Sequence, residues 1–162
     1  MRYLVVLAAL SLSACSPEGG QVCTGSDDPE ALSGSYCEGA EISWDSVQLG
    51  WLDSFRTLRI RYGIDTDGGL DPRFEIQVDG LATELTVDTE ISLSDYGYVR
   101  RWPGPGENAQ ILSDELESSS HLVFTELDAR AGGSARARFE MLIRNGRTLR
   151  GFVEGTLVDI TP

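Results

Sequence analysis

The chain has 162 residues and a formal net charge of −13, with 13 arginines, no lysine and 26 acidic residues. So large an acidic excess disfavours nucleic acid and anionic lipid surfaces as partners. Without a lysine amine there is no Schiff-base catalysis, no pyridoxal linkage and no phosphate-loop lysine. The enzyme classes that depend on a lysine are therefore excluded at the outset.

The first residues have the layout of an export signal. Arg2 is followed by an apolar run of nine residues, Leu4 to Leu12, and then by small residues. A run of this length is too short to cross about 30 Å of hydrocarbon as a helix, but it suits the core of a signal peptide. No later segment of the sequence is long or apolar enough to span a membrane.

The signal ends in Leu12-Ser13-Ala14-Cys15. This tetrapeptide fits the lipobox pattern, so residues 1–15 resemble the signal of bacterial lipoproteins. The resemblance implies cleavage before Cys15, lipidation of that residue and anchoring by several acyl chains, which hold far better than one. Because Ser16 follows rather than Asp, it also implies transfer to the outer membrane. An ordinary signal peptide with another cleavage site is the alternative.

Cleavage divides the chain into four expected parts. Residues 1–14 form the signal peptide, 15–22 the lipidated Cys and a tether, 23–40 a disulfide-closed loop, and 41–162 a β domain. The cleaved chain keeps 12 arginines and all 26 acidic residues, which gives a formal charge of −14. Its length suits one domain with a real hydrophobic core.

Two cysteines remain once Cys15 carries lipid. In an exported chain, Cys23 and Cys37 predict a disulfide. The bond would close a loop rich in Gly, Ser, Asp and Pro, with an entropic stabilisation of about 3 kcal/mol. A metal site there would need further Cys or His ligands, and the only histidine is His121.

From Ile42 onward the periodicity is that of half-buried antiparallel strands. Apolar and polar residues alternate over 57–64, 73–79 and 84–93, and only Glu107 to Glu117 has room for a short helix. The pattern predicts an all-β fold, a single antiparallel β-sandwich or small β-barrel of roughly seven to nine strands, with a disulfide-closed N-terminal loop. The residues expected to point inward are Leu58, Ile60, Tyr62, Ile64, Phe74, Ile76, Val78, Leu85, Val87, Ile91 and Leu93.

Near the C-terminus, Asn145-Gly146 lies between two strand-like runs and allows two registers. A two-residue turn pairs Arg138 with Val153. A three-residue loop, Arg144 to Gly146 with Gly146 left-handed in a bulge, instead puts opposite charges together on one face and apolar residues on the other. Each such pair contributes tenths of a kcal/mol, so the sequence predicts the bulged hairpin. Its pairs are Glu140 with Arg150, Arg136 with Glu154, Met141 with Leu149 and Ala137 with Val153.

The same register places two glycines of the hairpin on its inner face. Gly151 and Gly155 have no side chains there, so they leave room for a bulky neighbour such as Trp44 or Trp51.

The first candidate site is the segment Asp65 to Asp71, which lies between two predicted strands. Ca²⁺ needs about six to eight oxygen ligands, and Asp65, Asp67 and Asp71 can supply several of them. The spacing resembles part of a Ca²⁺ loop, although Gly69 stands where the EF-hand pattern requires a third ligand. Asp and Gly are also the ordinary residues of a hairpin tip, so a Ca²⁺ site and a plain turn both stay open.

The second candidate site is a set of three aromatic residues and an arginine at alternate positions, directly before Pro103-Gly104-Pro105-Gly106. Aromatic rings on an extended loop can stack on sugars or contact a partner protein, and Arg100 or Arg101 can add hydrogen bonds. Packing in the core is the alternative. The set consists of Tyr96, Tyr98, Arg100 and Trp102.

A third question is hydrolysis, for which His121 would be the sole imidazole base. Ser118 to Ser120 precede it, but neighbouring residues of a strand point to opposite faces and do not form a triad. Neither a Gly-x-Ser-x-Gly elbow nor a His-Glu-x-x-His pair occurs. We expect His121 to be a surface or edge residue, with a carboxylate-pair hydrolase as the remaining enzymatic alternative.

Taken together, the sequence predicts a lipoprotein anchored in the bacterial envelope, with the outer membrane as the expected location. Its β domain is expected to be non-catalytic, to interact with another envelope protein through a sheet edge or the aromatic segment or to serve a structural role, and not to bind nucleic acid. The alternative is a small-ligand, carbohydrate-binding module with a Ca²⁺ loop.

Overall fold

The computed structural model describes residues 32–37 and 42–161. One α-helix, α1 (Leu93–Tyr96), and three 3₁₀ turns, η1 (Ser35–Cys37), η2 (Asp53–Phe55) and η3 (Ser113–Glu115), lie among ten strands in this part of the chain. The strands are β1 (Ser46–Leu52), β2 (Thr57–Thr66), β3 (Gly69–Asp79), β4 (Glu90–Ser92), β5 (Gly97–Arg101), β6 (Gln110–Ile111), β7 (His121–Leu127), β8 (Ser134–Leu142), β9 (Thr148–Thr156) and β10 (Val158–Asp159).

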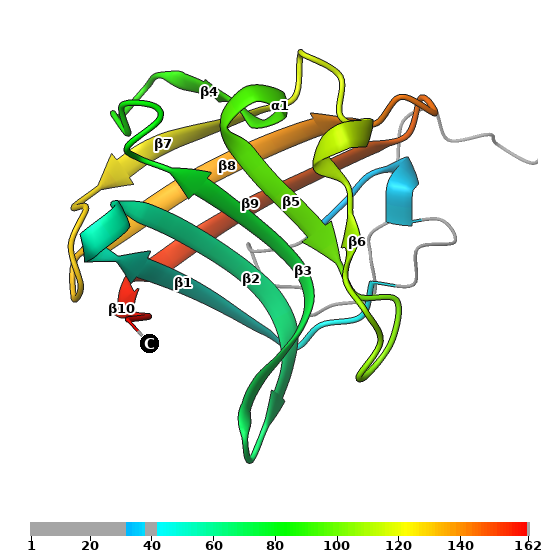
Figure 1. Ribbon diagram of the computed structural model, residues 1–162, viewed down its shortest axis with the longest axis horizontal. Coiled ribbons are helices and arrows are strands. Elements are labelled where there is room, and N and C mark those ends of the chain that lie inside the picture. The colour runs from blue at the N-terminus through cyan, green and yellow to red at the C-terminus, as the bar shows by residue number, and fades with distance from the viewer. Residues whose placement is uncertain (1–31, 38–41, 162) are drawn as a thin grey trace, which may run out of the picture.

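The strands form two sheets that pack face to face (Figure 1). The six-stranded sheet has the order β10-β1-β2-β3-β5-β6, and the four-stranded sheet has the order β4-β7-β8-β9. Each pair of neighbouring strands is antiparallel except β1 and β10. The predicted all-β fold is confirmed, and it is a sandwich rather than a closed barrel. Its strand count exceeds the expected one because β6 and β10, of two residues each, are too short to leave a periodic pattern.

The hydrophobic core lies between the sheets and is centred on aromatic rings. Tyr62 of β2 and Phe74 of β3 meet Phe139 of β8 from the opposite sheet, with ring centroids 6.3 and 6.2 Å from that of Phe139. Trp44 packs edge-on against Tyr62 at 5.2 Å. The alternation of β2 and β3 places Tyr62 and Phe74 inward as predicted. A register shift after Tyr62 ends this pattern, so Ile64 is only half-buried.

The third predicted strand is shorter than expected. Of residues 84–93, only Glu90 to Ser92 form a strand, and Val87, which was predicted to point inward, is 43% exposed. Asp88 adopts a left-handed conformation with φ 59°, which breaks the alternation. The Ser92 hydroxyl then caps α1 by accepting a hydrogen bond from the Asp95 N–H at 3.3 Å. Residues 107–117, where the sequence left room for a short helix, contain β6 and the 3₁₀ turn η3.

The predicted bulged hairpin is confirmed. Gly146 has φ 82°, and its N–H donates to the Ile143 carbonyl at 2.8 Å. β8 and β9 pair in the predicted register at all four positions, including Glu140 opposite Arg150 and Arg136 opposite Glu154. Both charged pairs form ion pairs with N···O distances of 2.7 Å. Local charge patterning was therefore sufficient to choose between the two turns.

The glycines of β9 face inward as predicted, but their neighbours differ. A Cβ on Gly151 would lie 2.3 Å from the Phe139 ring and 3.0 Å from the Leu32 side chain. A Cβ on Gly155 would lie 3.5 Å from Leu49, an ordinary contact. The predicted bulky neighbour is therefore present at Gly151, but the nearest side chain is Phe139 and not one of the two tryptophans named as examples. The rings of the opposite sheet hold Phe139 in this place.

The N-terminal predictions lie outside the described residues. Cys15 and Cys23 are not among them, so the signal peptide, lipidation and the Cys23–Cys37 disulfide stay predictions. Within 32–37 and 42–161, no helix has the length and apolar character needed to cross a membrane.

Gly151→Ala should destabilise the fold, and Gly155→Ala on the same strand is the matched control. The Phe139 ring cannot move away without disturbing its aromatic neighbours, so the first substitution should lower the free energy of unfolding by about 1–3 kcal/mol. The control should leave it nearly unchanged. Urea unfolding of both variants tests this, and equal midpoints would contradict the described packing.

Candidate functional site

The outer face of the six-stranded sheet carries a row of charged and aromatic side chains from three adjacent strands. Arg61 of β2 lies beside Glu75 of β3, which lies beside Arg100 of β5. One pair further along, Arg59 lies beside Gln77, and Gln77 lies beside Tyr98. Alternation directs all of them away from the core. We call this set, with Trp102, the arginine face: Arg59, Arg61, Glu75, Gln77, Tyr98, Arg100 and Trp102.

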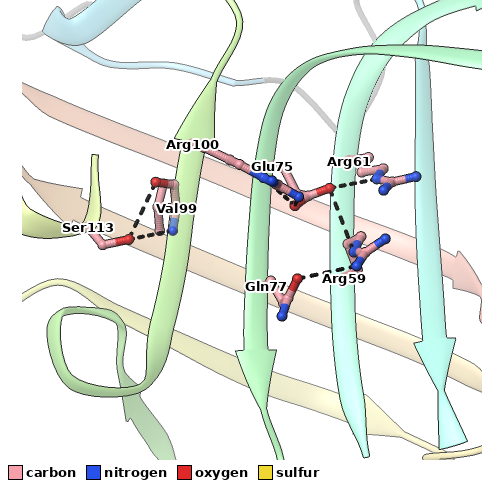
Figure 2. Close-up of polar contacts among 7 residues, drawn as sticks. All are labelled: Arg59, Arg61, Glu75, Gln77, Val99, Arg100 and Ser113. Atoms are coloured by element: carbon pink, nitrogen blue, oxygen red, sulfur yellow. Dashed lines mark hydrogen bonds and ion pairs between the residues drawn. The ribbon is translucent and has the colours of Figure 1, made fainter. Parts of the chain in front are cut away.

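Glu75 is the centre of the arginine face, and its side chain is completely buried although it points away from the core. Its Oε1 accepts hydrogen bonds from Arg100 Nε at 2.8 Å and from Nη2 at 2.5 Å. Its Oε2 accepts one from Arg61 Nε at 2.6 Å and lies 3.7 Å from Arg59 Nε. Figure 2 shows the carboxylate between the two β2 arginines on one side and Arg100 on the other. The Arg61 and Arg100 guanidinium groups thus supply the hydrogen bonds that water would otherwise give to an outward-facing carboxylate, and Arg59 adds a nearby positive charge.

The Arg100 guanidinium lies over two aromatic rings. Its central carbon lies 5.2 Å from the Tyr98 ring centroid and 5.1 Å from that of Trp102. Both distances suit cation–π attraction. Three of the four residues of the predicted aromatic set therefore act together, and they lie outside the core. Tyr96 does not share their alternation, because it is the last residue of α1.

The edge of β5 is completed by a side chain. Ser113 of η3 accepts a hydrogen bond from the Val99 N–H at 2.7 Å and donates to the Val99 carbonyl at 3.4 Å (Figure 2). The Leu112 N–H donates to the same carbonyl at 2.8 Å. These contacts satisfy the backbone of β5 where β6 does not pair with it, and so fix the strand that carries Arg100.

The arginine face has an unbalanced charge. Three guanidinium groups surround one carboxylate, which leaves two positive charges in a chain whose net charge is −13. Burial lowers the pKa of Arg59, and the nearby Glu75 carboxylate opposes that shift. An arginine nonetheless stays protonated at neutral pH. On the four-stranded sheet, by contrast, each of the Arg136–Glu154 and Arg150–Glu140 pairs balances its own charge.

The candidate Ca²⁺ residues are not brought together. They belong to the β2–β3 hairpin, which projects beyond the two sheets (Figure 1). Asp65 pairs with Leu70, so Asp71 points to the opposite face from Asp65. The Asp71 carboxylate forms an ion pair with Arg73 at 2.9 Å, and Asp67 belongs to the turn. In the described parts of the chain, no three His, Cys, Asp or Glu residues are grouped to hold a metal ion.

His121 is the first residue of β7 and lies at the surface of the four-stranded sheet. It borders a hollow of about 460 Å³ that is also lined by Arg138 and Phe152. Its Nδ1 lies 2.9 Å from the Ser119 carbonyl oxygen. The buried Ser120 hydroxyl instead bonds to Leu142, donating to its carbonyl at 3.1 Å and accepting from its N–H at 3.0 Å. The serine and histidine thus contact the main chain rather than each other.

The chain matches no protein-family model, no curated protein and no solved structure. Function must therefore be inferred from the geometry of the site. Sequence reasoning found Tyr98, Arg100 and Trp102 but missed Glu75 and its partners on β2. Alternation predicts that those residues face outward, yet no local signal shows that β5 lies beside β3.

Glu75→Gln should destabilise the protein strongly, with Glu140→Gln as the control. The first substitution leaves three guanidinium groups around a neutral amide, which should lower the free energy of unfolding by about 3 kcal/mol. We take the low end of the usual range because the arginine side chains keep 21–26% of their surface exposed. Glu140 pairs with one arginine in water, so its loss should change little. Chemical unfolding measures both, and similar effects would contradict a central role for Glu75.

Proposed function

We propose that this chain is a membrane-anchored lipoprotein of the bacterial envelope whose β-sandwich binds another envelope protein without catalysing a reaction. The lipobox at Cys15 supports the anchor and the location. The observation that carries the binding role is the arginine face, a preorganised, positively charged surface in a strongly acidic chain.

The composition of the arginine face supports a protein partner. Arginine and large aromatic residues are enriched where proteins bind one another, and fixed side chains lose less entropy on binding. Here Arg100 is fixed by the rings of Tyr98 and Trp102, and Arg61 by Glu75. Tyr98 remains 38% exposed. Because both rings already face Arg100, the geometry favours a protein over a sugar stacked between them.

Three edges, at β9, β1 and β5, are less suited to a partner than this face. At β9, Ser33 and Arg150 exchange backbone hydrogen bonds of 2.9 and 2.8 Å. At β1, β10 pairs with Gly50 and Trp51, and at β5 Ser113 takes the place of a strand. Covered edges resist the addition of a further strand. Of the two predicted modes of protein binding, these contacts support the aromatic segment over the edges at β9, β1 and β5.

Cys15→Ser should abolish the anchor. If Cys15 is the lipidated residue, the substitution removes the only thiol that can accept the acyl chains, so labelled fatty acid should no longer enter the protein. Membrane fractionation and labelling of cells that express each form measure this, with Cys23→Ser as the matched control. A Cys15→Ser protein that still incorporates fatty acid would contradict the lipoprotein assignment.

A photo-crosslinking residue at position 98 should capture the partner. Tyr98→p-benzoylphenylalanine keeps an aromatic ring on the arginine face, so irradiation of cells with the anchored chain should give a specific adduct with one envelope protein. The control is the same substitution at Phe152, on the outer face of the four-stranded sheet. Mass spectrometry identifies the adducts. The same proteins captured equally at both positions would contradict binding through the arginine face.

A further inference from the structure

We infer that the arginine face recognises an extended acidic polypeptide segment with carboxylates at alternate positions. This inference rests on the proposed function and names the chemistry of the partner. It follows from which guanidinium nitrogens Glu75 leaves unbound and from the neutral residue, Gln77, that the chain places among the arginines.

The point at which the arginines converge is already occupied. Glu75 takes the Nε atoms of Arg61 and Arg100, together with Nη2 of Arg100. A single phosphate or sulfate binds best where several guanidinium groups meet at one point, and here that point holds a carboxylate of the chain itself. An external ligand must therefore bind the guanidinium nitrogens that Glu75 does not take. Those nitrogens are spread along the sheet rather than gathered around a centre.

The spacing of the two β2 arginines matches the repeat of an extended peptide. Arg59 and Arg61 are two residues apart on β2 and lie on the same face, so their Cα atoms are separated by about 6.7 Å. Side chains at alternate positions of an extended peptide have the same repeat. Arg61 bonds to Glu75 through Nε, and Arg59 reaches Gln77 Oε1 through Nη2 at 3.3 Å. Terminal nitrogens of both arginines are left for two carboxylates of a partner in register.

Gln77 keeps the charge of this surface unbalanced. It lies directly between Arg59 and Tyr98, where a glutamate of nearly the same shape would neutralise one of the two excess charges. On the outer face of the other sheet, by contrast, Glu140 and Glu154 each pair with a single arginine. If these side chains served only to cover the sheet, a second glutamate at position 77 would make the fold more stable. The neutral amide leaves charge that an acidic partner can bind.

Gln77→Glu separates a binding role from a structural one. The new carboxylate should pair with Arg59 and leave the melting temperature unchanged or higher. Its charge should repel the carboxylates of the acidic partner and so weaken their binding. The full anchored chain, purified in detergent, is titrated by fluorescence anisotropy with a labelled peptide of about five Glu-Thr repeats, which matches the strand repeat. A peptide of the same composition with its glutamates in one block is the comparison. Arg138→Gln, which removes a charge from the other sheet, is the matched control.

The alternating peptide should bind more tightly than the block peptide, and Gln77→Glu should weaken it about tenfold or more. Arg138→Gln should bind like the unchanged chain. Equal affinity for the two peptides, displacement by inorganic phosphate at equal concentration, or no effect of Gln77→Glu would overturn the inference. A sedimentation coefficient that rises with protein concentration, and no longer does so in Gln77→Glu, would also overturn the inference. The arginine face would then bind a second copy of this chain.

The two proposals fail separately. If neither peptide binds but the adduct at position 98 persists and Gln77→Glu removes it, the alternating-carboxylate inference is overturned and the proposed function stands. If position 98 captures no specific partner, the proposed function is overturned as well.

Discussion

The buried carboxylate of Glu75 determines how the outer surface of the six-stranded sheet is organised. A carboxylate without water needs its hydrogen bonds from the protein, because an unpaired buried charge costs several kcal/mol. Glu75 obtains them from β2 on one side and from β5 on the other. Three strands are thereby linked on a face that has no apolar core of its own. The arginine side chains consequently lie along the sheet rather than extending into solvent.

Because the arginine face depends on contacts between three strands, it was harder to predict from the sequence than the fold was. Alternation is a local property, so Leu58, Ile60 and Phe74 could be assigned to the core from the sequence alone. The β8–β9 register could also be predicted, since its ion pairs are separated by one short loop. β3 and β5, however, are separated by β4 and α1. The contact of Glu75 with Arg100 depends on which strands become neighbours, and alternation does not contain that information.

The errors in the predicted elements have similarly local causes that hydrophobic patterning does not detect. Val87 continues an apolar alternation, but the left-handed backbone of Asp88 turns the chain before a strand can form. The Ser92 cap then starts a short helix where alternation predicts extended chain. In each case a backbone conformation or a single hydrogen bond outweighs side-chain periodicity, because the segment is too short to bury much apolar surface.

The two outer faces of the sandwich use the same residue types with different results. On the four-stranded sheet, arginine and glutamate face each other singly in water, where each pair contributes little to stability and carries no net charge. On the six-stranded sheet, the same groups are partly desolvated and unequal in number, so their charge acts at short range with little screening. The rest of the chain is negative and repels an acidic partner until the partner reaches this face. Selectivity then depends on fit at contact distance, where register and spacing decide the outcome, rather than on long-range attraction.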